Sequence, residues 1–200
     1  MSKLSKKIGF VVQSKTEKFY EDESSWSRAA LAKLRRGVGK ELGEIPEILE
    51  YVLLDLPGEV VESERDTERA EIAIYTALTM FAVHQQGKEQ FMGKEEQEDK
   101  QRQSFGQAVR ILTNANSDHE KAIKRRFDKV LSSYDLKELS VHARSIIGLL
   151  KAANIPLDYA AFAEDLFWFQ NSDFKRSVIL KWTQDYFRYN KKDIQEKGEK

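Results

Sequence analysis

Three histidines are the side chains of this sequence whose type is best suited to metal or acid–base chemistry. His84, His119 and His142 lie far apart, with no HxxxH or HxH spacing and no carboxylate–histidine cluster of metal-ligand spacing. The chain has no cysteine, which excludes a thiolate zinc site, a cysteine nucleophile and a disulfide. Phosphate-loop, dinucleotide-binding and nucleophile-elbow motifs do not occur. We therefore expect no enzyme activity, no metal and no cofactor.

Clustered carboxylates are the other groups that could support acid–base chemistry. Glu95, Glu96, Glu98 and Asp99 are bunched in a polar stretch between residues 88 and 103. No apolar residues surround them to raise a carboxyl pKa toward the value that a general acid needs. We interpret residues 88–103 as an exposed, mobile loop rather than a catalytic site.

Basic residues point away from the apolar side of several predicted helices. In the segment 118–132, Ile123 and Phe127 set the buried direction at 100° per residue, and Arg125 points directly away from it. Flexible cations in this arrangement suit phosphate binding, which needs no particular base sequence. A solvated helix face is the alternative for each helix taken alone. The candidate nucleic-acid contacts are Lys33, Arg36, Arg110, Lys124, Arg125, Arg126, Lys129 and Arg144.

These residues need helices to position them, and the sequence predicts helices nearly throughout. Apolar residues recur at helical spacing, only three prolines interrupt the chain, and no strand-like run has a hairpin partner. The expected fold is all-α, with about eight helices in two packed bundles and no significant sheet. Helices are expected near residues 6–20, 24–37, 47–53, 66–87, 105–114, 118–132, 136–153, 158–168 and 172–189.

Capping patterns and aromatic stripes refine this expectation. Ser104-x-x-Gln107, Ser117-x-x-Glu120 and Asp135-x-x-Glu138 each resemble a capping box, and Ser24 or Ser25, Asp66 or Thr67, Asp158 and Ser172 can begin further helices. The aromatic stripe that includes Phe162, Phe169, Trp182 and Tyr186 is interpreted as core rather than as a base-stacking platform. We expect an N-terminal helical part at 1–115, a C-terminal helical part at 116–190 and a disordered tail at 191–200.

Overall charge bounds the kind of nucleic-acid binding that is expected. The chain has 33 basic and 33 acidic residues, so its formal charge is zero, whereas a free-standing nucleic-acid binder is usually basic. Binding must then come from local patches and from neighbouring subunits. No stretch approaches a membrane span and the N-terminus lacks a signal-peptide core, so we expect a cytoplasmic protein without membrane contact.

Seven short runs, in order along residues 26 to 187, together resemble the CasB family. They are RAALAKLRR (28–36), AIYTALTMFAVHQQ (73–86), SFGQAV (104–109), KRRF (124–127), HAR (142–144), IPLDY (155–159) and WTQDYF (182–187). Each run is a weak signal alone, but the ordered series is specific. This family is the small subunit of Cascade, the type I-E CRISPR surveillance complex.

The resemblance implies an all-α protein of two helical parts, two copies of which line the belly of the complex. Its implied partners are the backbone and large subunits, guide RNA, target DNA and a second copy of itself. Its implied role is to stabilise the R-loop, in which guide RNA pairs with one DNA strand and displaces the other; cleavage belongs to a separate helicase-nuclease. The resemblance carries the family's basic positions to Arg36, Arg110, Arg125, Arg126 and Arg144.

Two other classes of function stay open at this point. The first is a purely structural helical scaffold whose basic faces pair with acidic partner subunits and do not contact nucleic acid. The second is a helical enzyme of unfamiliar type, which would need a deep pocket lined by buried ionisable groups. Detectable binding to single-stranded DNA at low salt would separate the nucleic-acid role from the scaffold.

Overall fold

Apolar residues that recur every three to four positions fold into helices along most of the chain. The structure is a computed structural model, which describes residues 3–22, 24–54, 63–94 and 102–189. Within these residues there are nine α-helices, two short 3-10 helices and no strand, which confirms the predicted all-α fold. The elements are α1 (Lys3–Glu21), α2 (Ser25–Leu34), η1 (Arg35–Gly37), α3 (Pro46–Leu53), α4 (Glu64–Gln85), α5 (Phe105–Ala115), η2 (Ser117–His119), α6 (Glu120–Leu131), α7 (Leu136–Ala152), α8 (Tyr159–Phe169) and α9 (Ser172–Arg188).

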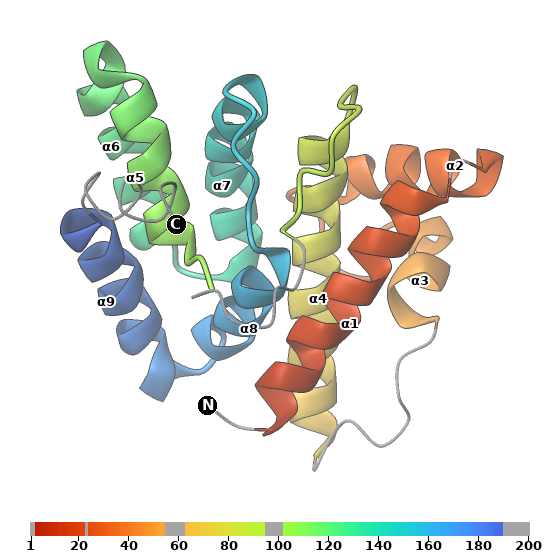
Figure 1. Cartoon of the computed structure of the whole chain (residues 1–200). Coiled ribbons are helices and arrows are strands. Elements are labelled where there is room, and N and C mark those ends of the chain that lie inside the picture. Colours follow the sequence, from red (N-terminus) through yellow and green to blue (C-terminus); the bar gives the residue numbers. More distant parts are fainter. Residues whose placement is uncertain (1–2, 23, 55–62, 95–101, 190–200) are drawn as a thin grey trace.

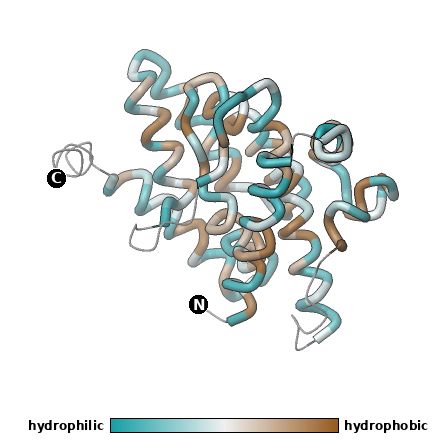
Figure 2. The backbone as a smooth tube through the Cα atoms, turned by 45° about the vertical axis from the view of Figure 1, so that its right-hand side comes forward, coloured by the Kyte–Doolittle hydropathy of each residue, from teal (hydrophilic) through white to brown (hydrophobic). Residues whose placement is uncertain are grey.

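Helix α8 lies at the centre of the molecule, between two groups of helices (Figure 1). It packs against α1, α4 and α9, and ten of its eleven residues are buried. Helix α7 packs against α4 and α6, and α5 packs against α6 and α9. Figure 2 shows apolar residues interrupted by hydrophilic ones along the helices, as expected where one side of a helix is buried. A boundary between two helical parts near residue 115 stays a prediction.

Aromatic rings from four helices form a large part of the core. The ring of Phe105 lies 5.1 Å from that of Phe162 and 5.2 Å from that of Trp182, between centroids. Phe127 lies 5.2 Å from Tyr186 in the same way. Phe127, Phe162 and Trp182 are fully buried, which confirms that these aromatic residues belong to the core.

The helices α5 and α9 approach each other so closely that one position accepts only glycine. A Cβ atom at Gly106 would lie 2.0 Å from the backbone carbonyl oxygen of Trp182. Backbone cannot move aside as a flexible side chain can, so glycine at this position allows the two helices to pack.

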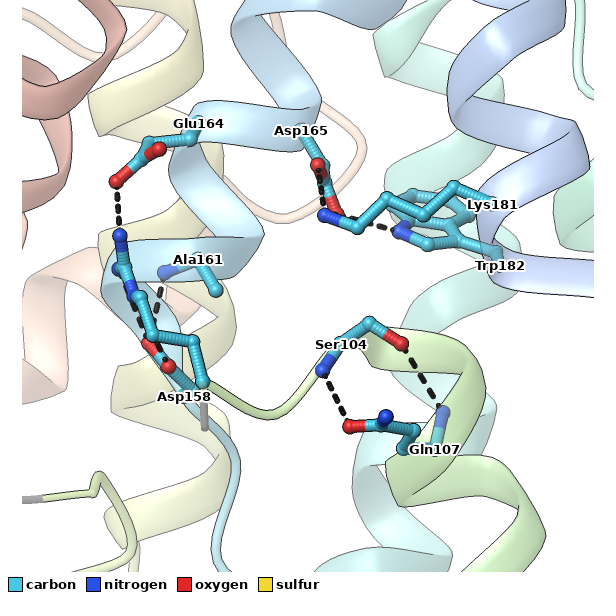
Figure 3. A network of polar contacts seen from close by, with 9 residues as sticks. Ser104, Gln107, Asp158, Ala161, Glu164, Asp165, Lys181 and Trp182 are labelled. Atoms are coloured by element: carbon cyan, nitrogen blue, oxygen red, sulfur yellow. Dashed lines mark hydrogen bonds and ion pairs between the residues drawn. The ribbon is translucent and has the colours of Figure 1, made fainter. Parts of the chain in front are cut away.

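Side-chain caps begin four helices where the sequence predicts them. Ser24, Ser104, Asp135 and Asp158 each accept a hydrogen bond from a backbone N–H in the first turn of their helix. The capping box of α5 is complete, because Gln107 N lies 3.2 Å from Ser104 Oγ and Ser104 N lies 3.1 Å from Gln107 Oε1 (Figure 3).

Two other predicted helix starts are wrong. Helix α4 begins before Asp66, because the hydroxyl of Ser63 accepts a hydrogen bond from Asp66 N at 3.3 Å. Helix α9 is capped by Asn171 rather than by Ser172, since the Asn171 side chain accepts from Asp173 N at 3.0 Å. In both places a polar residue just upstream of the predicted cap binds the first-turn N–H groups.

Two of the three predicted capping boxes are also incomplete. Ser117 opens the 3-10 helix η2, and α6 starts at Glu120 without a side-chain cap. At α7, the carboxylate of Glu138 accepts a hydrogen bond from the N–H of the residue before Asp135, at 2.6 Å, instead of from the cap itself. Both segments contain the residue types of a capping box, but their hydrogen bonds do not form the complete capping-box pattern.

The segment between α4 and α5 differs from the exposed loop that the sequence predicts for residues 88–103. Met92 and Gln103 are buried, and Arg102 forms ion pairs with Asp158 and with Glu164 of α8 (Figure 3). These partners come from a distant part of the sequence, so a local reading of a polar stretch does not find them. The clustered carboxylates at 95–99 and the tail at 191–200 lie outside the described residues.

Candidate nucleic-acid interface

Three cations form a line along the solvent side of α6. The helix buries Ile123 and Phe127, and Lys121, Arg125 and Lys129 lie on the opposite side at successive turns. All three are exposed, and none has a carboxylate partner among the residues that the structure describes. We call Lys121, Arg125 and Lys129 the α6 stripe. Neighbours four residues apart on a helix lie about 5–6 Å from each other, so the stripe presents regularly spaced positive charge.

Two further predicted cations flank the stripe but hold partners of their own. Lys124 pairs with Asp128, and its ammonium nitrogen lies 5.7 Å from the centroid of the Phe187 ring. Arg110 of α5 lies 3.4 Å from the carboxylate of Glu120 and 5.5 Å from the ring of Tyr186. Both side chains are about 30% exposed. Their charges reach the surface, but packing restricts their motion.

Arg126 and Arg144 are two further predicted cations, on α6 and α7. Each is exposed and has no ion-pair partner within the described part of the chain. Arg126 lies on α6, and Arg144 lies on α7, which packs directly against α6. The structure therefore brings five of the eight predicted residues together on α5 and α6, with a sixth on the adjacent helix.

The remaining two predicted residues lie on the other side of the molecule, where α2 and η1 are far from α6 (Figure 1). Lys33 is half-buried rather than exposed as predicted, because its ammonium group donates to the hydroxyl of Tyr51 at 3.1 Å. This hydrogen bond raises the pKa of Lys33. Arg36 is exposed, as predicted, and pairs with Glu47. Both cations thus bind groups of α3 and are less free than the α6 stripe.

A third group of cations was not predicted from the sequence. Lys151 Nζ lies 3.3 Å from Gln86 Oε1, and Lys88 Nζ lies 2.5 Å from Asn154 Oδ1, which joins the C-terminal ends of α4 and α7. Burial, and then the charges of Lys88 and Arg35, lower the pKa of Lys151. The partial negative charge of two helix C-termini favours cations here, so these residues have a structural explanation. Only a lysine in the last turn of α7 hints at this group in the sequence.

Comparison with known protein families assigns this chain to one of them. The sequence model described as CRISPR-associated protein Cse2 matches residues 30–187, which is most of the chain. This chain belongs to the Cse2 family. The matched region of this Cse2 chain includes the α6 stripe and all eight predicted contacts. No relative among the curated proteins matches it.

Solved structures agree with the Cse2 assignment. CasB from Thermobifida fusca is similar with a TM-score of 0.73 and 27% sequence identity, over 90% of this chain and 97% of that chain. A Cse2-family protein from Thermus thermophilus is similar with a TM-score of 0.66 and 17% identity, over 94% and 100% of the two chains. A chain of a CRISPR RNA-guided surveillance complex has a TM-score of 0.65 and 20% identity, over 92% and 94%. The resemblance to CasB is confirmed.

The buried ionisable groups of this Cse2 chain serve packing. Asp165 accepts hydrogen bonds from Lys181 at 2.7 Å and from the Trp182 indole at 2.7 Å, which ties α8 to α9 (Figure 3). His84 lies 3.0 Å from the hydroxyl of Tyr159, and burial lowers the pKa of this histidine to about 3. His84 is therefore neutral at physiological pH.

The described residues of this Cse2 chain were also considered as possible metal ligands and membrane spans, and they form neither. They contain no group of three or more histidine, cysteine or acidic residues placed to hold a metal. None of their helices has the length and apolar character that crossing a membrane requires.

Proposed function

We propose that this chain is the non-catalytic small subunit of a type I-E CRISPR surveillance complex, in which it binds nucleic-acid backbone. The observation that carries this proposal is the α6 stripe, where Lys121, Arg125 and Lys129 are exposed without carboxylate partners in the described residues. Membership of the Cse2 family and the likeness to a chain of an RNA-guided surveillance complex support the assembly role.

Binding through the stripe is electrostatic and independent of base sequence. Lysine and arginine side chains that neutralise phosphates release condensed counterions, so affinity falls steeply as salt rises. In an R-loop the RNA–DNA duplex formed is about as stable as the DNA duplex lost, so a few backbone contacts decide the balance. We infer that the basic side of α5, α6 and α7 stabilises the R-loop and its displaced strand in this way.

The zero formal charge of the chain limits how strongly the isolated protein attracts nucleic acid. A chain without net positive charge attracts nucleic acid only where its cations gather, so binding by the isolated protein is weak. We propose that the backbone and large subunits, guide RNA, target DNA and a second copy of this chain complete the interface in the cytoplasm.

Replacing Arg125 and Arg126 together with alanine tests this proposal. Both residues are exposed, so the free energy of unfolding should change by no more than about 0.5 kcal/mol per site. Target binding by the assembled complex should weaken about equally for all target sequences. Each lost phosphate contact should flatten the slope of log K against log salt by about 0.7 for a single strand or 0.9 for duplex.

The matched control is Arg65→Ala. This substitution removes an exposed arginine from the first turn of α4 and leaves α6 unchanged. Its complex should keep the affinity and the salt slope of the unaltered complex. If the double variant also keeps both values while assembly is intact, Arg125 and Arg126 are not nucleic-acid contacts. That result would favour a purely structural scaffold.

A further inference from the structure

Two of the four aromatic residues of α9, Phe174 and Phe187, are exposed rather than part of the core. Phe187, in the last turn of the helix, is 63% exposed, whereas its neighbour Tyr186 is 1% exposed. Their ring centroids lie 5.1 Å apart with the planes nearly perpendicular. Tyr186 packs on Phe127 of α6, so the backbone that carries Phe187 is anchored in the core. The exposed ring is thus held by a rigid support.

The surroundings of Phe187 are cationic rather than apolar. Lys124 lies 5.7 Å from its ring centroid, and Arg188, the next residue of α9, is exposed. Arg110 lies over the ring of Tyr186 at 5.5 Å. An apolar protein partner would remove these charged groups from water, which is costly. A ligand with both negative charge and a flat apolar face would satisfy the cations and cover the ring.

We propose that Phe187 is a stacking platform for an unpaired base of single-stranded nucleic acid, whose phosphates bind Lys124 and Arg110. This inference rests on the proposed function and narrows its ligand to a strand with unstacked bases. Exposed aromatic rings beside cations are the usual means of binding single strands without sequence preference. In a duplex the bases are stacked on each other, so their faces are not available to the ring.

The carboxylates near this site do not prevent phosphate binding. Lys124 pairs with Asp128, and Arg110 lies 3.4 Å from Glu120, but both carboxylates are more than half exposed. Ion pairs open to solvent contribute only about 0–1 kcal/mol, so a phosphate can replace the carboxylate at little cost. Lys124 is therefore held beside the Phe187 ring, and Arg110 beside the adjacent ring of Tyr186, before the ligand arrives.

Phe187→Leu removes the aromatic face and keeps an apolar side chain of similar size. Binding of the full chain to a labelled oligothymidylate and to a hairpin duplex would be measured by fluorescence anisotropy at low salt. The single-strand dissociation constant should rise about five- to a hundredfold, which is the range found for the loss of one stacked base. The duplex constant should change less than about twofold. Phe187→Trp should restore single-strand binding, with quenching of its added indole fluorescence.

Phe10→Leu supplies the matched control, because Phe10 is 67% exposed and lies on α1, away from α9 (Figure 1). It should change neither constant. Equal weakening of both ligands by Phe187→Leu, or no effect on the single strand, would overturn the stacking role. If Arg125→Ala with Arg126→Ala weakens single-strand binding while Phe187→Leu does not, only this inference fails. If the unaltered chain, alone and assembled, binds neither ligand, the proposed function fails and this inference fails with it.

Discussion

At the scale of single residues, Glu164 shows how burial and pairing compete. Its side chain is 1% exposed, and one oxygen pairs with Arg102 while Oε2 has no hydrogen-bond partner within the described part of the chain. Burial raises the pKa of Glu164 above its ordinary value of 4.5, although the hydrogen bond from Arg102 opposes this. Arg102 is 46% exposed, so water weakens its attraction and burial dominates.

This balance predicts that Glu164→Gln stabilises the protein at neutral pH. A carboxyl whose pKa is raised on folding binds its proton more tightly in the folded state. Unfolding free energy contributed by Glu164 should therefore fall as pH rises from about 4.5 through the raised pKa. The neutral amide removes this loss, so the variant should gain stability over the unaltered protein as pH increases. Urea unfolding across this pH range measures the difference.

Glu68→Gln is the control for this experiment, since Glu68 is exposed on α4. Because this side chain is exposed, the substitution should change the free energy of unfolding by no more than about 0.5 kcal/mol. A Glu164→Gln variant that is less stable at every pH would mean that the ion pair with Arg102 outweighs the cost of burial.

Helical periodicity predicts the environment of a residue well when its own helix decides that environment. Phe127 is buried and Arg125 is exposed, as the 100° spacing along α6 predicts. Lys33 is half-buried because Tyr51 of α3 lies beside it, and no feature of α2 predicts this neighbour. Phe187 is exposed because it lies about 100° around α9 from Tyr186, which is buried on the same side as Val178 and Trp182.

At the scale of elements, two helical glycines should respond in opposite directions to alanine. Gly106→Ala brings a Cβ to 2.0 Å from the Trp182 carbonyl oxygen, so α5 and α9 must separate. We expect a loss of about 1–3 kcal/mol of unfolding free energy, or more. Gly148 of α7 has no neighbour within 4 Å of such a Cβ, so Gly148→Ala should gain about 0.5–1 kcal/mol from helix propensity.

Chemical denaturation of both glycine variants provides the measurement, each serving as the control for the other. A Gly106→Ala variant with an unchanged free energy of unfolding would show that the distance between the two helices is adjustable.

The existence and type of the helices can be predicted from the sequence, as the complete capping box of α5 illustrates. Their ends do not, because the first turn of α6 is set by the short helix η2 and the start of α4 by Ser63.

At the scale of the whole molecule, α8 should be the most stable helix. It is buried on nearly every side and packs against α1, α4 and α9. Its amide hydrogens should exchange only through global unfolding, whereas those of α3, which packs mainly on α2 and α4, should exchange through smaller openings. Native-state hydrogen exchange at increasing denaturant measures this order. Exchange of α8 amides through local opening would contradict the prediction.

The sequence predicts the fold class and the family, but it does not predict which helices meet. The pairing of α1 with α8 and the contact of Arg102 with Glu164 join residues far apart in the chain. The division of the predicted basic residues between two sides of the molecule has the same origin, because each helix wheel gives a direction only relative to its own helix. Two residues of the α6 stripe, Arg125 and Lys129, were predicted because a single helix contains them, whereas Lys121 was not among the predicted contacts.

The packing of α1 against α8 also affects how the chain folds during synthesis. The ribosome makes α1 before α8, at about 5–20 residues per second, so α1 waits on the order of ten seconds for its main partner. Until then Ile8 and Val12, both fully buried in the finished molecule, face water or other chains. We therefore expect this apolar side of α1 to stay exposed for longer during synthesis than it would in a protein with local contacts.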